Sequence, residues 1–415
     1  MRDLMTIAQA AQTAKSTVAR LSSSEKNQGL HAIADTLLAN TQAILAANQL
    51  DISKAQENGL NAGLIDRLTL TEARICDIAE GCRQVAALPD PIGDVLWQHT
   101  RPNGLRIGLR RVPMGVIGMI YEARPNVTVD AAALCFKAGS ACILRGGKEA
   151  FHSSKCLADL MRQALTSCGL PADTINLVED TSHESAAQMM RLNGYLDVLI
   201  PRGGAGLIRT VVETATVPVI ETGTGNCHIY VDAQADLDMA VQILENAKCQ
   251  RISVCNAAES LLVHKDVAAA FLPLAANAFA PYHVLLHGCP RTMEILGDMV
   301  IPAADKDYAT EYLGYEISVK VVDSIEDAIA HINCYNTGHS ECIVTESYSA
   351  AQQFTDAVDA AAVYVNASTR FTDGFEFGFG AEIGISTQKL HARGPMGLEA
   401  LTTQKYVIFG NGQVR

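Results

Sequence analysis

The feature that most constrains the fold is a regular alternation of short apolar segments with longer amphipathic segments between residues 115 and 201. The short segments have the composition of buried strands, and the longer ones repeat apolar residues at helical spacing. Such alternation is typical of a parallel, doubly wound sheet covered by helices on both faces. Strands are predicted at 115–121, 141–145, 174–178 and 197–201, and helices at 126–138, from about 153, and after 178.

A second stretch of the same kind runs from near Ile229 to about Val358. We therefore expect a second doubly wound α/β domain. Ahead of both stretches, about ninety residues rich in Ala and Leu show helical periodicity and predict a layer of helices. The predicted strands of the second domain lie at 260–264, 284–287, 317–322 and 342–345, and capping boxes are predicted at Ser22–Glu25 and Thr69–Glu72.

Residues 96–113 predict a β-hairpin, because two extended stretches flank Asn103-Gly104, a pair that tolerates positive φ at both centres of a tight turn. A lone hairpin is marginally stable in water. We expect the C-terminal strand near Tyr406–Phe409 to join it and to form a small oligomerisation flap.

The amino-acid composition excludes several classes of function. The net charge of −13 argues against general nucleic-acid binding, which relies on clustered Lys and Arg. No apolar run approaches the ~20 residues of a membrane span, and the N-terminus lacks a signal-peptide core, so we expect a cytoplasmic protein without membrane association. The twelve cysteines are scattered, without a Cys-x-x-Cys pair or a His-Glu-x-x-His motif, which indicates reduced thiols and no metal site.

Two segments between the α/β stretches carry candidate chemistry. Residues 219–226 predict a buried strand entering a Gly-rich turn that carries Glu221, and residues 248–259 predict a helix and a break that carries the thiol of Cys255. Any one cysteine is more often inert core filling than a nucleophile. The spacing of 34 residues between Glu221 and Cys255 nevertheless resembles the aldehyde dehydrogenase superfamily, whose glutamate and catalytic cysteine hold these places. Further segments that resemble the superfamily are 111–118, 311–314 and 363–366.

Four segments carry a closer resemblance within the superfamily, and they are 121–126, the stretch around Glu221, 328–343 and 391–397. By these segments the chain most resembles the γ-glutamyl phosphate reductases, also called glutamate-5-semialdehyde dehydrogenases, over nearly its whole length. One departure is Asn336, where Gly or Ser would be expected. The resemblance implies NADPH-dependent reduction of L-glutamyl 5-phosphate to L-glutamate 5-semialdehyde and phosphate, the second step of proline biosynthesis from glutamate.

The resemblance also assigns catalytic roles. Cys255 would form a thioester with the substrate, and the Asn126 side-chain amide with the Cys255 backbone N–H would hold the oxyanion. Glu221 matches the superfamily's base. Asn126 could instead be a helix cap, and Glu221 a solvated or cofactor-facing carboxylate.

For the cofactor, Lys148 stands where NAD-preferring relatives often carry a glutamate for the adenosine ribose. Lys148 and Arg145 should attract the 2′-phosphate of NADPH, unless both are ordinary cations of a solvated loop. Gly203-Gly204 suits a pyrophosphate at a helix N-terminus, or only a tight turn. Glu311 resembles the residue that holds the nicotinamide ribose.

The substrate carries a carboxylate and a phosphate, so cations should gather near Cys255. The candidates are Arg124, Arg370, His391 and Arg393, each of which could equally be a surface ion pair.

The expected layout is an aldehyde-dehydrogenase-like fold with three parts. Residues 1–225 would be the NADPH-binding domain, including hairpin 96–113 of the flap; residues 226–358 would be the catalytic domain; and residues 359–415 would return to the cofactor domain and end in the flap strand. We also expect a homo-oligomer and a transient contact with glutamate 5-kinase, which makes the acyl phosphate. Two rival functions are left open: an NAD(P)-dependent oxidising dehydrogenase of another semialdehyde, and an inactive binding protein of the same fold.

Overall fold

The computed structural model of the chain describes residues 2–60 and 62–415. The chain forms two compact units. The first comprises Met1–Thr222, Gly378–Gly384 and Met396–Arg415, and the second comprises Gly223–Phe377 and Ile385–Pro395. Among the described residues, no helix is both long and apolar enough to cross a membrane.

The predicted N-terminal layer of helices is confirmed. Its members are α1 (Leu4–Val18), α2 (Ser23–Ala39), α3 (Thr41–Glu57), α4 (Ala62–Leu68) and α5 (Glu72–Ala87). The Ser22–Glu25 capping box is present at the start of α2. The box predicted at Thr69 is wrong. The N-cap of α5 is Thr71, which accepts from the Arg74 N–H at 3.1 Å, whereas the Thr69 hydroxyl donates to the Ile65 carbonyl at 2.7 Å.

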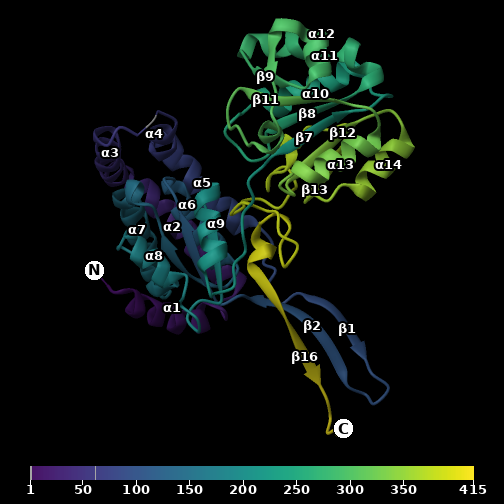
Figure 1. Cartoon of the computed structure of the whole chain (residues 1–415). Helices are drawn as coiled ribbons and strands as arrows, with labels where there is room; N and C mark the ends of the chain where they lie inside the picture. Colours follow the sequence, from purple (N-terminus) through teal and green to yellow (C-terminus); the bar gives the residue numbers. More distant parts are fainter. Residues whose placement is uncertain (1, 61) are drawn as a thin grey trace. The chain divides into compact units, whose positions relative to one another are not determined.

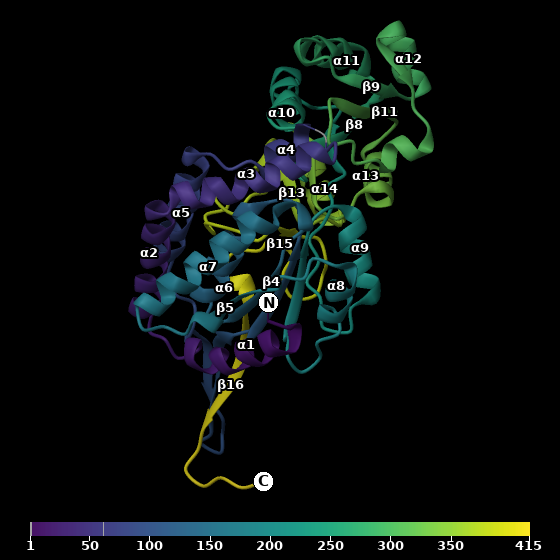
Figure 2. The ribbon, with the colours of Figure 1, turned by 90° about the vertical axis from the view of Figure 1, so that its left-hand side faces the viewer.

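The first unit contains a parallel four-stranded sheet in the order β5-β4-β3-β6. Every residue of β3 and β4 is buried, which explains their continuous apolar sequences. Helices α6 and α7 cover one face, and α1, α8 and α9 cover the other (Figure 2). The predicted doubly wound sheet is confirmed. The bounds are β3 (Val116–Tyr121), α6 (Pro125–Lys137), β4 (Ala141–Arg145), α7 (Phe151–Ser167), β5 (Ile175–Leu177), α8 (His183–Met189), β6 (Val198–Arg202) and α9 (Ala205–Thr214).

The hairpin and the C-terminal strand form an antiparallel ribbon in the order β1-β2-β16, as predicted (Figure 1). The bounds are β1 (Val95–Thr100), β2 (Arg106–Pro113) and β16 (Thr402–Phe409). The turn differs from the prediction, because only Gly104 has a positive φ, of 86°. The Arg101 carbonyl accepts from the Gly104 N–H at 2.9 Å. Pro102 lies at the second position of this four-residue turn, where proline is favoured in type I and type II turns.

The second unit contains a parallel seven-stranded sheet in the order β10-β9-β11-β8-β7-β12-β13. Helices α10, α11 and α12 pack on one face, and α13 and α14 on the other. The bounds are β7 (Cys227–Val231), α10 (Leu237–Cys249), β8 (Ala258–His264), α11 (Lys265–Phe279), β9 (Leu285–Gly288), α12 (Pro290–Leu296), β10 (Val300–Pro302), β11 (Glu316–Val322), α13 (Ile325–Tyr335), β12 (Ser340–Val344), α14 (Tyr348–Ala357) and β13 (Ala362–Val365), with the short pair β14 (Ile385–Ser386) and β15 (Gly394–Pro395).

The expected return of the chain at residue 359 is wrong. Strand β13 pairs in parallel with β12, from Ser340 opposite Ala362 to Ile343 opposite Val365, so the second unit continues to Phe377. The chain then passes between the units more than once, because Ile385–Pro395 also belongs to the second unit. A strand belongs to the sheet of the strand with which it pairs. The local sequence pattern does not identify that partner strand.

Candidate active site

Cys255 lies in the loop that joins the end of α10 to the start of β8. Its side chain is partly exposed. The Ala257 N–H donates to the Val254 carbonyl at 3.2 Å and closes a turn around the cysteine. Gly225 lies against this loop so closely that a Cβ there would overlap the Cys255 carbonyl group. The Gly-rich turn that the sequence singled out is therefore required by the backbone of the Cys255 loop.

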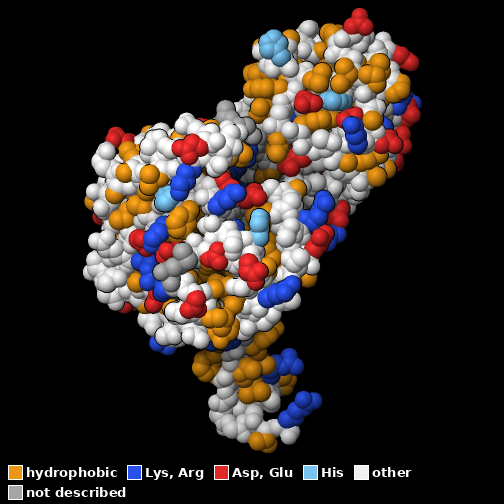
Figure 3. Space-filling model, turned by 60° about the vertical axis from the view of Figure 1, so that its left-hand side comes forward, with side chains coloured by type: hydrophobic (Ala, Val, Ile, Leu, Met, Phe, Trp, Pro, Cys, Tyr) orange, Lys and Arg blue, Asp and Glu red, His pale blue; other side chains and the backbone are white. Residues whose placement is uncertain are grey.

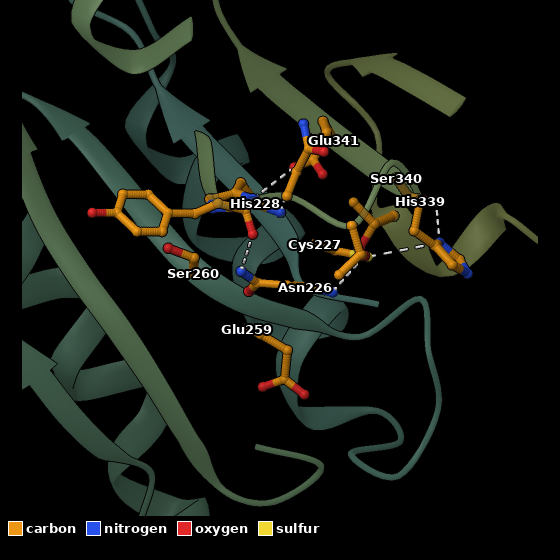
Figure 4. Close-up of polar contacts among 12 residues, drawn as sticks. Asn226, Cys227, His228, Glu259, Ser260, His339, Ser340 and Glu341 are labelled. Carbon is orange, nitrogen blue, oxygen red and sulfur yellow. Dashed lines mark hydrogen bonds and ion pairs between the residues drawn. The ribbon is translucent and has the colours of Figure 1, made fainter. Parts of the chain in front are cut away.

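A second thiol lies beside Cys255. The Cys227 S–H donates to the Cys255 carbonyl at 3.3 Å, and its sulfur lies 3.8 Å from Nδ1 of His339 (Figure 4). Cys227 is fully buried, and burial raises the pKa of its thiol well above the usual range. Cys227 therefore stays protonated and supports the loop, and the partly exposed Cys255 is the better candidate nucleophile.

Arg370 is held against the same loop by Asn256. The Asn256 amide donates to the carbonyls of Arg370 at 3.2 Å and of Thr372 at 3.0 Å, and the Arg370 guanidinium donates to the Asn256 side-chain oxygen. Burial lowers the pKa of Arg370, as does the cation of Arg251, whereas the negative charge of Asp373 opposes these shifts. The structure therefore places this predicted cation against the loop that carries Cys255.

Glu311 also approaches the Gly-rich turn. Its carboxylate accepts from the Gly225 N–H at 2.7 Å. Gly225 thus contacts both Cys255 and the residue predicted to hold the nicotinamide ribose.

The last two predicted cations of the second unit lie near its surface. Arg393 donates to the Asp359 carboxylate at 2.6 Å, and Lys389 donates to the other oxygen of Asp359 at 2.5 Å. His391 is exposed and has a positive φ of 64°. Arg393 therefore forms a surface ion pair, the alternative to substrate binding that the sequence left open. Such pairs typically contribute ~0–1 kcal/mol to the free energy of unfolding.

In the first unit, Arg145 and Lys148 line a cavity of ≈ 580 Å³ at the carboxyl ends of β3 and β4. Lys148 is exposed at its wall. Arg145 donates through Nη2 to the carbonyls of Thr181 at 2.7 Å and Ser182 at 2.9 Å, while its buried Nε makes no hydrogen bond to any residue that the structure describes. Burial lowers the pKa of Arg145. Ligands of α/β sheets bind at this end of the strands.

The start of α9 already has an anionic acceptor. The Gly204 N–H donates to the Glu122 carboxylate at 2.8 Å, and a Cβ at Gly203 would lie 2.6 Å from the same carboxylate. A side chain at position 203 would therefore require the flexible ends of Glu122 and Leu207 to move. Glu122 lines the cavity, and sequence reasoning missed it. A pyrophosphate at this helix end would have to displace its carboxylate.

Asn126 is not the cap of α6, because the N-cap is Arg124 and Pro125 opens the helix. The capping explanation for Asn126 is therefore wrong. Its amide donates to the Asp130 carboxylate at 3.0 Å, one helical turn further on. Burial raises the pKa of Asp130 to about 6, and the bond from Asn126 opposes that shift. Sequence reasoning missed Asp130, although the four-residue spacing on one helix face was a usable signal.

The predicted residues are thus divided between the units. Glu221 is half-buried just after Val219, which bridges to Leu199 of β6. The first unit holds Arg124, Asn126, Arg145, Lys148, Gly203, Gly204 and Glu221, and the second holds Cys255, Glu311, Arg370, His391 and Arg393.

Comparison with known proteins gives consistent matches over the whole chain. The model of the aldehyde dehydrogenase family matches residues 2–285 and 301–407. The chain is 59% identical over 415 residues, all of both chains, to a gamma-glutamyl phosphate reductase of Carboxydothermus hydrogenoformans. It is also 59% identical over 413 residues to one of Enterococcus faecalis, covering 100% of this chain and 99% of the relative. The crystal structure of gamma-glutamyl phosphate reductase from Thermotoga maritima superposes with a TM-score of 0.98 at 48% identity, over 100% of both chains.

Proposed function

The chain belongs to the aldehyde dehydrogenase family, and from this premise we propose that it reduces L-glutamyl 5-phosphate to L-glutamate 5-semialdehyde and phosphate, the second step of proline biosynthesis. The fold and the family expected from the sequence are confirmed. The observation that carries the proposal is the 59% identity, over full length, to relatives that bear this activity in their names.

In the proposed first step, the Cys255 thiolate attacks the γ-carbonyl carbon of the acyl phosphate. The S–C bond forms, the bond from carbon to the phosphate oxygen breaks, and phosphate leaves with the electron pair. A thiolate is a strong nucleophile even when only partly ionised. The guanidinium of Arg370, held against the Cys255 loop by Asn256, would favour the ionised thiol. Cys227, a neutral donor to the Cys255 carbonyl, keeps the loop in place.

The tetrahedral intermediates place negative charge on the former carbonyl oxygen. The proposed donors are the Cys255 N–H and the amide of Asn126, and a preorganised donor of this kind contributes ~3–4 kcal/mol. Asp130 fixes the Asn126 amide by accepting one of its hydrogens. After reduction, the carbonyl re-forms as the C–S bond breaks, and the thiolate leaves.

The family uses a nicotinamide cofactor, and we propose NADPH. When bound, it supplies the hydride that reduces the thioester carbonyl. Two observations support the fit: Lys148 lies at the wall of the 580 Å³ cavity, and the buried Nε of Arg145 has no hydrogen-bond partner within residues 2–60 and 62–415. Both side chains would attract a 2′-phosphate. Glu311 would hold the nicotinamide ribose, while Glu122 would have to leave the Gly204 N–H for a pyrophosphate to bind there.

Residues Arg124, His391 and Arg393 remain proposals for binding the substrate anions, and Glu221 remains the proposed base. The β1-β2-β16 ribbon supports a homo-oligomer, because hydrophobic side chains gather on it in Figure 3. Exposed large hydrophobic residues of the ribbon are Val95, Leu96, Tyr406, Ile408 and Phe409. A cytoplasmic location and a transient contact with glutamate 5-kinase complete the proposal.

The deciding experiment is a steady-state assay in reverse, with L-glutamate 5-semialdehyde, NADP and phosphate. We expect NADP reduction that depends on phosphate. Reduction of NADP without phosphate would favour an oxidising dehydrogenase. Absence of turnover together with a Cys255 thiol inert toward iodoacetamide would favour a binding protein.

A further inference from the structure

A fully buried ion pair closes the base of the Cys255 loop. Lys248, in the last turn of α10, donates to the Glu259 carboxylate at 2.5 Å, and both side chains are 0% exposed. Glu259 lies at the start of β8. The loop between the two residues carries Cys255, so this one contact joins the point where the chain enters the loop to the point where it leaves.

The second oxygen of Glu259 reaches another loop. It accepts from the Leu313 N–H at 3.1 Å. Leu313 has a left-handed φ of 54° although it is not a glycine, and its side chain is 40% exposed. A left-handed conformation costs a bulky residue about 1–2 kcal/mol and persists only when its surroundings hold it. A buried carboxylate that accepts from this N–H provides such a hold.

The contacts continue from Leu313 back to Cys255. Glu311, two residues before Leu313, accepts from the Gly225 N–H, and Gly225 lies against the Cys255 carbonyl. The side chain of Glu259 points away from the neighbouring cluster of Cys227, His228 and Glu341 in Figure 4. Its contacts are therefore directed to Lys248 and Leu313.

We propose that Lys248 and Glu259 are positioning residues that hold two loops in register, one carrying Cys255 and the other carrying Glu311. Glu259 acts through the Leu313 N–H, and Lys248 provides the opposite charge that keeps a carboxylate at this buried position. The inference rests on the proposed function in one respect: the effect on cofactor binding requires Glu311 to hold the nicotinamide ribose.

Stability alone does not require this ion pair. Replacement of a buried ion pair by apolar residues of similar size is often neutral or stabilising, whereas removal of one partner leaves an uncompensated charge. Burial raises the pKa of Glu259 to about 7, and the attraction of Lys248 opposes that rise. The contact with Leu313 provides a functional reason to retain a hydrogen-bond acceptor at this buried position, and Lys248 compensates the charge when that acceptor is a carboxylate.

The test compares two double variants that both remove the charges. Lys248→Met/Glu259→Gln keeps an acceptor for the Leu313 N–H, and Lys248→Met/Glu259→Leu lacks one. A purely structural pair would leave the two variants alike. We measure the affinity for NADPH and for 2′,5′-ADP, which contains the adenine half and the 2′-phosphate but no nicotinamide ribose.

We expect the Gln variant to bind NADPH within about twofold of wild type. The Leu variant should lose about tenfold, the value of one well-formed hydrogen bond. Binding of 2′,5′-ADP should be unchanged in both variants. Equal NADPH affinities in the two variants, or a parallel loss of 2′,5′-ADP binding in the Leu variant, would overturn the proposal.

Hydrogen exchange of the Leu313 amide gives a test that needs no variant to fold. We expect protection in the wild-type protein despite the exposed side chain. Exchange at the rate of an unprotected amide would refute the proposed role of the hydrogen bond from the Leu313 N–H to Glu259. A Glu311→Gln protein that binds NADPH as tightly as wild type would instead refute the proposed role of Glu311 and leave the exchange result standing.

Discussion

The contact between Gly225 and the Cys255 carbonyl makes Gly225→Ala a direct test of how the proposed nucleophile is placed. An added Cβ would overlap the carbonyl carbon and oxygen of Cys255 and would lie 2.9 Å from its Cα, where ordinary contacts begin at 3.4 Å. The obstacle is backbone, which cannot rotate away as a side chain could. One of the two loops must therefore move by on the order of 1 Å.

Such a displacement should be costly for catalysis. A misplacement of about 1 Å can reduce the rate about a hundredfold, because reacting atoms must meet within a narrow range of distance and angle. The Gly225 N–H also holds Glu311, so the same movement disturbs a second proposed site residue. We expect kcat of Gly225→Ala to fall about a hundredfold and the free energy of unfolding to fall by about 1–3 kcal/mol from overpacking.

The assay measures kcat in the phosphate-dependent reaction, the rate of Cys255 alkylation by iodoacetamide, and thermal unfolding. Gly81→Ala in α5 is the matched control, because its added Cβ would meet only the Asp130 carboxylate at 4.0 Å. That control should keep full activity and gain about 0.5–1 kcal/mol, as expected for Gly to Ala within a helix. Retention of more than about a tenth of wild-type kcat by Gly225→Ala would refute this account of the loop.

Four further predictions concern Cys255, Lys148, Glu221 and His331. Cys255→Ser should leave less than about one percent of turnover with the fold intact, since a hydroxyl is far less ionised than a thiol near neutral pH; higher residual kcat would exclude the thioester mechanism. Lys148→Glu should shift the ratio of kcat/KM for NADPH and NADH at least about tenfold toward NADH, and an unchanged ratio would make Lys148 an ordinary solvated cation. Glu221→Gln should lower phosphate-dependent turnover by less than about tenfold, because phosphate is already an ionised nucleophile; a loss of several hundredfold, with Cys255 alkylated normally, would instead indicate a base acting after acylation. Burial lowers the pKa of His331 to about 3, so its contribution to stability is present above its unfolded pKa and is lost as pH falls toward 3. Between pH 7 and pH 5, wild type should lose about 2 kcal/mol of unfolding free energy relative to His331→Phe in urea titrations, and an equal difference at both pH values would contradict this.

The secondary structure was largely readable from the sequence because its causes are local. The alternation from residue 115 to residue 201 predicted all four strands of the first sheet, within a residue or two at each end. The Ser22–Glu25 box was equally readable, since both partners lie within one helical turn. The Thr69 box failed because Thr71 is placed to cap α5 and the Thr69 hydroxyl is used by α4.

Cys255 could be singled out because the resemblance marks it, and its loop is short. The residues that hold the Cys255 loop in place could not be predicted from the sequence. Cys227, Asn256 and Gly225 make their contacts there only in the folded chain, and their spacing in the sequence does not indicate those contacts. The same holds for Glu122, which approaches Gly204 across 82 residues of sequence.

The sequence by itself determined which segments are strands and helices, because hydrophobic periodicity is a local property that the unfolded chain already has. Its resemblance to a known family indicated the family and marked Cys255 as the proposed nucleophile. Only the tertiary structure decided that residues 359–377 belong with the second unit, that Asp130 holds Asn126, and that Lys248 and Glu259 join two loops. Strand pairing and buried polar contacts depend on which surfaces meet once the chain is compact, and a buried charge is tolerated only where its partner has been brought to it.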